Sequence, residues 1–366
     1  MDLRRTKRAL LVAALLTTGI LPTSAMAQET AADIEIHDGE PWVLYQRFQD
    51  GLHLRMIRPD GSGDHEIAVE VPGAKVHPDW SPDGQRIAFS VEDMGQIWVI
   101  DADGSDALQI VDCIEPCVLV DAPAWSPDGG SIAFLRIIAP ADALPYTQVQ
   151  VLDLATEELR TVFEPEPAIE APWYMRWSPD GERLVISLEH YESADSDIID
   201  CSVIAVLDVD DASPEPLVLT DPTIFATYPD WSPDGEHILF TTYDLGFRDG
   251  GSYADRMPAS NLYTIAPDGS DLQQLTFNEP GESPVRDGTA SGDLATQPTW
   301  TPDGEGITFV HVSGDEWPGW GMAMIDADGS DMRPAAGDTF LYGTHPRLRP
   351  TPGADAAGSP PSRRSA

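Results

Sequence analysis

Two histidines and a glutamine are the residues of this sequence whose spacing could bring metal-binding side chains together at one site. His77 and Gln297 each lie three residues before a tryptophan of a repeated string, and His345 lies three residues before Leu348 in a similar string. Two imidazoles and an amide oxygen could hold a divalent metal ion. The alternative is that these side chains cap strands and form hydrogen bonds with the backbone.

The string that positions these residues is Trp-Ser-Pro-Asp-Gly, with Thr in place of Ser in the last copy. Each copy predicts a strand that ends near the tryptophan, a tight turn, and a second strand of alternating apolar residues. A third strand and an Asp-Gly-Ser turn then lead to a short outer strand, which completes a four-stranded antiparallel unit. We expect the tryptophans to pack between such units. The copies begin at Trp80, Trp125, Trp177, Trp231 and Trp300.

The repeats predict an all-β fold, a six-bladed β-propeller of four-stranded antiparallel blades. The five full repeats supply five blades. The sixth combines strands near residues 42–57 with an inner strand at 345–350, so that the C-terminal strand completes the N-terminal blade and closes the ring. Seven blades is the alternative, because the spacing of 69 residues between Trp231 and Trp300 could contain a degenerate blade. Residues 278–297 lack a strand pattern, which favours six blades.

The position of His77 is occupied in other repeats by Ala122, Tyr174 and Tyr228. In a closed ring, all these side chains would stand around the mouth of the central channel. The glutamine and the two histidines would then lie on consecutive blades.

This repeat, with its Asp-Ala-Asp-Gly-Ser turn, resembles the propeller repeats of the TolB-like family over roughly residues 41–350. The family implies the propeller fold. TolB itself is a periplasmic protein of the Tol-Pal envelope system, and its propeller follows an α/β domain for which we expect no room here. We therefore expect a stand-alone propeller. The arrangement of His77, His345 and Gln297 is also distantly similar to the metal site of TolB-like oligogalacturonate lyases.

The first 27 residues have the three parts of a secretory signal: a basic start, an apolar stretch of 13 residues and an Ala-Met-Ala site. The apolar stretch is too short to span a membrane. We expect cleavage before Gln28, a lead-in over 28–40, the propeller over 41–350 and a disordered tail over 351–366. The mature protein is then exported, either periplasmic or secreted, with no transmembrane segment.

Charge and cysteine content restrict the partners and the compartment. The chain has 366 residues with 21 Lys+Arg against 62 Asp+Glu, a formal net charge of −41, so nucleic acid is not an expected partner. Scattered acidic residues are typical of a solvated surface, and a surface for cations or a basic partner is the alternative. Cys113 and Cys117 are close enough to pair, which leaves Cys201 as a buried thiol. Pairing of Cys201 with one of the others is the alternative.

The long insertions between the expected strands all fall on one face of the propeller, which we call the long-loop face. Uneven loops on a regular scaffold are typical of a binding surface, and exposed aromatic and arginine side chains are its usual anchors. The candidate anchors are Arg248, Tyr253, Arg256, Trp317 and Trp320.

These observations predict an exported, non-enzymatic binding or scaffold propeller that engages a protein or glycan partner through the long-loop face and needs no cofactor. The sequence has no Gly-x-Ser-x-Gly, the string in which the nucleophile of propeller-containing peptidases lies. The alternative is a metal-dependent carbohydrate-active, lyase-like or lactone-cleaving enzyme with its site at the channel mouth.

Overall fold

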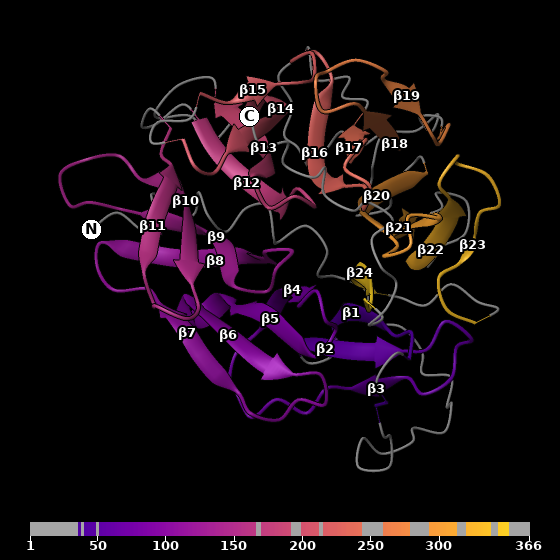
Figure 1. The fold of residues 1–366 in the computed structure, drawn as a ribbon, viewed down its shortest axis with the longest axis horizontal. Helices are drawn as coiled ribbons and strands as arrows, with labels where there is room; N and C mark the ends of the chain where they lie inside the picture. Colours follow the sequence, from indigo (N-terminus) through magenta and orange to yellow (C-terminus); the bar gives the residue numbers. More distant parts are fainter. Residues whose placement is uncertain are drawn as a thin grey trace, which may run out of the picture.

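The computed structural model of this chain is a ring of β-sheets around a central axis (Figure 1). The structure describes residues 36–37, 40–48, 51–165, 170–191, 199–211, 215–243, 259–278, 293–312, 320–337 and 343–350. Within these ranges, only the backbone of residues 93 and 320 is described.

Within the described residues, four sheets have four antiparallel strands each. One contains β24 (Thr344–Leu348), β1 (Val43–Phe48), β2 (Leu52–Ile57) and β3 (His65–Glu66). The next contains β4 (Lys75–Trp80), β5 (Arg86–Val91), β6 (Gln96–Asp101) and β7 (Leu108–Asp112), with the short 3-10 helix η4 (Glu92–Met94) between β5 and β6. The third contains β8 (Cys117–Trp125), β9 (Ser131–Ile138), β10 (Tyr146–Asp153) and β11 (Leu159–Phe163). The fourth contains β12 (Glu170–Trp177), β13 (Arg183–Tyr191), β14 (Ile199–Asp208) and β15 (Leu217–Val218).

The fifth sheet has eight strands and combines the last two tryptophan repeats. Its strands are β16 (Phe225–Trp231), β17 (Ile238–Tyr243), β18 (Ser260–Ile265), β19 (Gln273–Gln274), β20 (Leu294–Trp300), β21 (Gly306–Val312), β22 (Trp320–Asp326) and β23 (Arg333–Pro334).

The all-β class is confirmed, but the predicted count of six four-stranded blades is wrong. Four separate four-stranded sheets are seen in the described ranges, because the last two repeats share one sheet. The link is a parallel pairing of Ser260 in β18 with Leu294 in β20. The Ser260 hydroxyl strengthens this link, because the hydroxyl donates to the Ala295 carbonyl and accepts from the Ala295 N–H, both at 2.9 Å. Repeat spacing could not reveal a link that depends on where two loop ends meet.

The ring closes through the two ends of the propeller, as predicted. Strand β24 pairs antiparallel with β1, with Leu348 opposite Val43. The inner strands β4, β8, β12, β16, β20 and β24 contact one another in that order and back to β4. Arg349, 1% exposed, secures the junction by donating to the carbonyls of Gly84 (2.7 Å) and His37 (2.9 Å).

The repeat tryptophans pack between neighbouring sheets, as expected. Trp80 of β4 is buried in one apolar cluster with Leu54 and Met56 of β2. Arginine side chains add cation–π contacts, such as the Arg86 guanidinium 4.7 Å from the ring centroid of Trp125. Burial of these large rings ties each sheet to the next.

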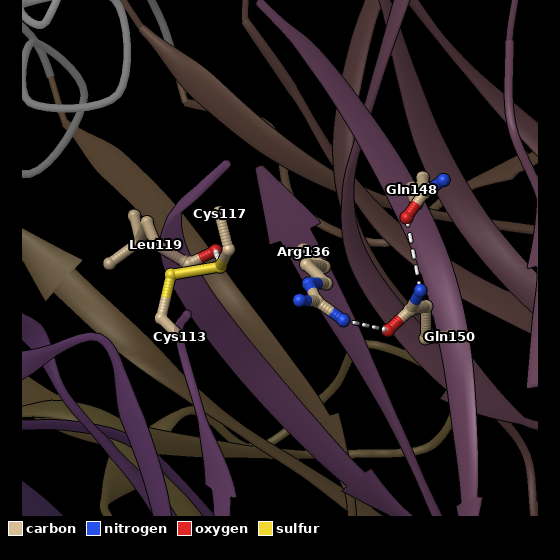
Figure 2. The surroundings of a disulfide bond; sticks show 6 residues. All are labelled: Cys113, Cys117, Leu119, Arg136, Gln148 and Gln150. Carbon is tan, nitrogen blue, oxygen red and sulfur yellow. Dashed lines mark hydrogen bonds between the residues drawn. A yellow bond between two sulfur atoms is a disulfide. The ribbon is translucent and has the colours of Figure 1, made fainter. Parts of the chain in front are cut away.

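The cysteines form the nearer pair. Cys113 and Cys117 are joined by a disulfide across the connection between β7 and β8 (Figure 2), and Cys201 is a half-buried free thiol. The pairing predicted first is therefore confirmed. Among the described residues no helix is long and apolar enough to cross a membrane. The expected leader over 1–27 and tail over 351–366 lie outside the described residues.

Candidate functional site

The inner strands share an irregularity near the channel axis. In each, the register shifts around the residue three before the repeat tryptophan or Leu348, and that residue has a left-handed backbone with φ between 37° and 54°. A left-handed backbone costs a residue with a Cβ about 1–2 kcal/mol. Such strain persists where the surrounding structure over-determines it, and it is common at functional sites. We call these residues the channel-mouth cluster: His77, Ala122, Tyr174, Tyr228, Gln297 and His345.

The aromatic side chains of the cluster meet across the axis. The ring of His77 is edge-on to those of His345 and Tyr174, with centroid separations of 4.9 and 5.6 Å. Tyr174 and Tyr228 lie 4.1 Å apart, and the Tyr174 hydroxyl donates to the Tyr228 hydroxyl at 3.2 Å. Side chains from four inner strands therefore converge at one place.

Asp121 of β8 orients and charges His77. Its Oδ1 lies 2.7 Å from Nδ1 of His77 and also accepts the backbone N–H of Ala122 at 2.7 Å. Burial lowers the pKa of His77, but the Asp121 carboxylate outweighs that effect and the pKa is raised overall. Burial likewise raises the pKa of Asp121, whereas His77 and the Ala122 N–H bring it below its usual value. The pairing thus favours the protonated imidazole and the ionised carboxylate, and the two side chains are only 18% and 11% exposed.

His345 is the neutral partner in this cluster. Burial lowers its pKa well below the usual value, and the nearby positive charges of His77 and Arg176 lower it further. Its backbone N–H donates to Oε1 of Gln297 at 2.9 Å. Both ring nitrogens are shielded from solvent and have no hydrogen-bond partner among the described residues. The imidazole thus retains one donor and one acceptor.

A layer of charged side chains lies two residues further along the inner strands. Asp79 is 3.6 Å from a guanidinium nitrogen of Arg347, and Asp230 is 3.9 Å from Nε of Arg176. Burial raises the pKa of Asp230 to about 7 and also raises that of Asp79, while Arg176 opposes both shifts. We call these residues the charged layer: Asp79, Arg176, Asp230 and Arg347.

The structure brings together the three residues predicted for the channel mouth, since His345 contacts both His77 and Gln297. Asp121 and the charged layer were missed. The pattern that could have found the charged layer is a charged residue directly before the tryptophan or Leu348 in four of the inner strands. Of the predicted loop anchors, Arg248, Tyr253, Arg256 and Trp317 lie outside the described residues. Trp320 is described only as the first backbone position of β22.

A divalent metal at His77, His345 and Gln297 finds a poor set of ligands. Oε1 of Gln297 already accepts the His345 N–H. Across the described ranges, no three or more His, Cys, Asp or Glu side chains are grouped to hold a metal ion. The role of these residues as metal ligands stays a prediction.

The described part of the long-loop face carries exposed apolar side chains. The Gly95 carbonyl accepts the Cys113 N–H at 3.0 Å, which places the η4 connection beside the disulfide loop. Met94 on that connection is 44% exposed, and Ile114 in the disulfide loop is 67% exposed. Exposed apolar groups that gather on one face are typical of interaction sites.

Comparison with known proteins agrees with this architecture. The family model for the TolB beta propeller domain matches residues 96–336, more than half of the chain, and the chain belongs to this family. No curated protein matches the chain significantly.

Solved structures with similar folds include two TolB proteins and a lyase. TolB from Acinetobacter baumannii has a TM-score of 0.58 and 16% identity, with 86% of this chain and 67% of that chain covered. A protein described as TolB from Agrobacterium tumefaciens has a TM-score of 0.55 and 19% identity, covering 83% and 90%. An oligogalacturonate lyase in complex with manganese has a TM-score of 0.51 and 13% identity, covering 82% and 74%. At these identities the similarity shows the fold alone.

Proposed function

We propose that this chain is an exported, non-enzymatic binding propeller whose protein or glycan partner docks on the long-loop face, centred on the channel mouth. The observation that carries the proposal is the channel-mouth cluster. The same left-handed position recurs on the six inner strands, and five of them, all but β8 with Ala122, place an aromatic or polar side chain there. The cluster contains imidazole, phenol and amide groups suited to contacts with a partner.

The direction of the strands relates this cluster to the long-loop face. Each tryptophan repeat's inner strand ends at the tight turn after its tryptophan, and the cluster residue comes earlier in the strand than the charged layer. The cluster therefore lies toward the opposite end of the channel, where the strands begin and the long connections emerge. A partner on that face meets the cluster at its centre and the exposed Met94 and Ile114 at its rim.

Site-specific photo-crosslinking tests this docking face. A photoreactive amino acid replaces Ile114 on the long-loop face, and a matched control replaces Glu305, an exposed residue in a tight turn at the other end. In the cells that produce the protein, we expect a discrete adduct from position 114 and none from position 305. Mass spectrometry of the adduct identifies a protein or a glycan. Equal labelling at both positions, or none at position 114, would contradict the proposal.

Export is supported by the expected leader and by the disulfide between Cys113 and Cys117, because disulfides persist in oxidising compartments. We expect the mature chain to begin at Gln28 and to be found outside the cytoplasm. N-terminal sequencing of protein from fractionated cells checks both points. A full-length chain confined to the cytoplasm would refute this part of the proposal.

A metal-dependent carbohydrate-active or lactone-cleaving enzyme is the second candidate. The observation in its favour is the Asp121–His77 hydrogen bond, since metal-binding histidines commonly donate their other ring N–H to a carboxylate. Elemental mass spectrometry of the purified protein tests it, with the His77→Ala/His345→Ala double variant as the control. One equivalent of metal that the double variant loses would favour the enzyme over the binder. Without such a stoichiometric metal, this candidate is abandoned.

A further inference from the structure

The channel contains buried hydrogen-bonding groups that the described residues do not satisfy. They are Nε of Arg176, Nε of Arg347 and both ring nitrogens of His345. Buried polar groups in proteins nearly always have a partner, because an unpaired one loses its hydration without compensation. The two arginine atoms can only donate, and neutral His345 supplies one further donor and one acceptor, so donors outnumber acceptors three to one. The missing partner is therefore a group rich in acceptors.

These atoms belong to one region of the channel. His345 and Arg347 are two residues apart on β24. Arg176 of β12 is two residues from Tyr174, whose ring centroid lies 6.5 Å from that of His345. His345 belongs to the channel-mouth cluster, and the two arginines belong to the adjoining charged layer two residues further along their strands.

The aspartates of the charged layer do not provide the missing acceptors. Their separations from the arginines, 3.6 and 3.9 Å, exceed hydrogen-bond length. One oxygen of each aspartate is already engaged, since Asp79 accepts the backbone N–H of Trp125 and Asp230 that of Trp300, both at 2.8 Å. The arginines are thus held near their counter-charges with Nε left for another acceptor.

We infer that Arg176, Arg347 and His345 bind a carboxylate group. A carboxylate offers two oxygens with several acceptor sites and suits the planar donors of arginine. The two guanidinium groups favour its negative charge against the repulsion of the Asp79 and Asp230 carboxylates, whereas a metal cation there would face both arginines. This inference rests on the unpartnered donors and does not depend on the docking partner proposed above.

Nuclear magnetic resonance of the complete chain tests the site with acetate as the probe. Sodium acetate is titrated at constant ionic strength against sodium chloride, and the His345 ring proton, assigned with His345→Gln, is followed. We expect a saturable shift with acetate and none with chloride. Arg347→Gln should weaken acetate binding at least tenfold. The control Arg333→Gln, at an exposed arginine paired with Asp326, should leave it unchanged.

A second variant and a second probe complete the experiment. If Arg347→Gln does not fold, Arg176→Lys keeps the positive charge, removes Nε, and should cause the same tenfold loss. A capped Gly-Asp-Gly peptide and its Gly-Asn-Gly control then separate the sources of the carboxylate. Binding of the aspartate peptide indicates a polypeptide ligand, and binding of acetate alone indicates a free small acid.

Three results would overturn the inference. The first is the absence of a saturable acetate effect on His345, as expected if only water occupies these donors. The second is an equal response to acetate and chloride. The third is acetate affinity that both arginine variants retain. None of these bears on the crosslinking test of the docking face, so the two proposals fail separately.

Discussion

Replacing Asp121 with asparagine removes the charge that His77 contacts while it nearly preserves the size of the side chain. The wild-type atoms are 2.7 Å apart, and both side chains are largely buried. A hydrogen bond to a charged group contributes about 1.5–3 kcal/mol. Since water screens this pair poorly, we expect Asp121→Asn to lower the free energy of unfolding by about that amount at pH 5.5. The pKa of His77 should fall, because burial then dominates.

The effect has a defined pH window. The raised pKa of His77 contributes stability that is fully present below 6.5, its unfolded value, and is lost as the pH rises through the folded value. The lowered pKa of Asp121 contributes stability that is present above 3.8 and is lost as the pH falls through the folded value. The difference between wild type and variant should therefore be largest between these two values and smaller at pH 9.

Urea unfolding followed by tryptophan fluorescence at pH 5.5 and pH 9 measures this difference. The control is Glu66→Gln, which removes the partner of His53 at the same distance of 2.7 Å, where the side chains are 31% and 50% exposed. That exposed pair should contribute less than about 1 kcal/mol. An Asp121→Asn effect of equal size at both pH values, or no larger than that of the control, would refute the reasoning.

Three further changes have expected outcomes. Arg349→Ala should lower the free energy of unfolding by about 3 kcal/mol, because it removes a fully buried side chain and leaves the buried Gly84 carbonyl without its donor; urea unfolding measures it. Burial raises the pKa of Glu189 to about 8, so wild-type stability should fall from pH 4.5 to 8 by up to about 1.4 kcal/mol per pH unit, and Glu189→Gln should flatten that slope. Cys113→Ser/Cys117→Ser opens a short loop and should cost about 2 kcal/mol, the same as reduction of the wild type. An unchanged unfolding midpoint in the Arg349 or cysteine variant, or an unchanged pH slope of stability in Glu189→Gln, would contradict the reasoning.

The backbone plan of this protein could be predicted because it is encoded locally. Proline, aspartate and glycine at fixed offsets specify the tight turns, and alternating apolar residues specify the strands that follow. The likeness of the string around His345 to the one around His77 was enough to predict that β24 pairs with β1. Equivalent positions in a repeat occupy equivalent places in the ring, which is why both histidines and Gln297 could be assigned to one channel mouth.

The sequence by itself thus determined the all-β class, the repeat, the closure of the ring and the position of the candidate site. Only the tertiary structure decided that two repeats share one sheet through Ser260, that Asp121 charges His77, and that His345 is left neutral and unpartnered. These outcomes join residues that are far apart in sequence. The outcomes for His77 and His345 also depend on burial at the axis, where the loss of water sets each group's charge and makes an unmatched donor costly. Turn and strand patterns carry no information about that environment.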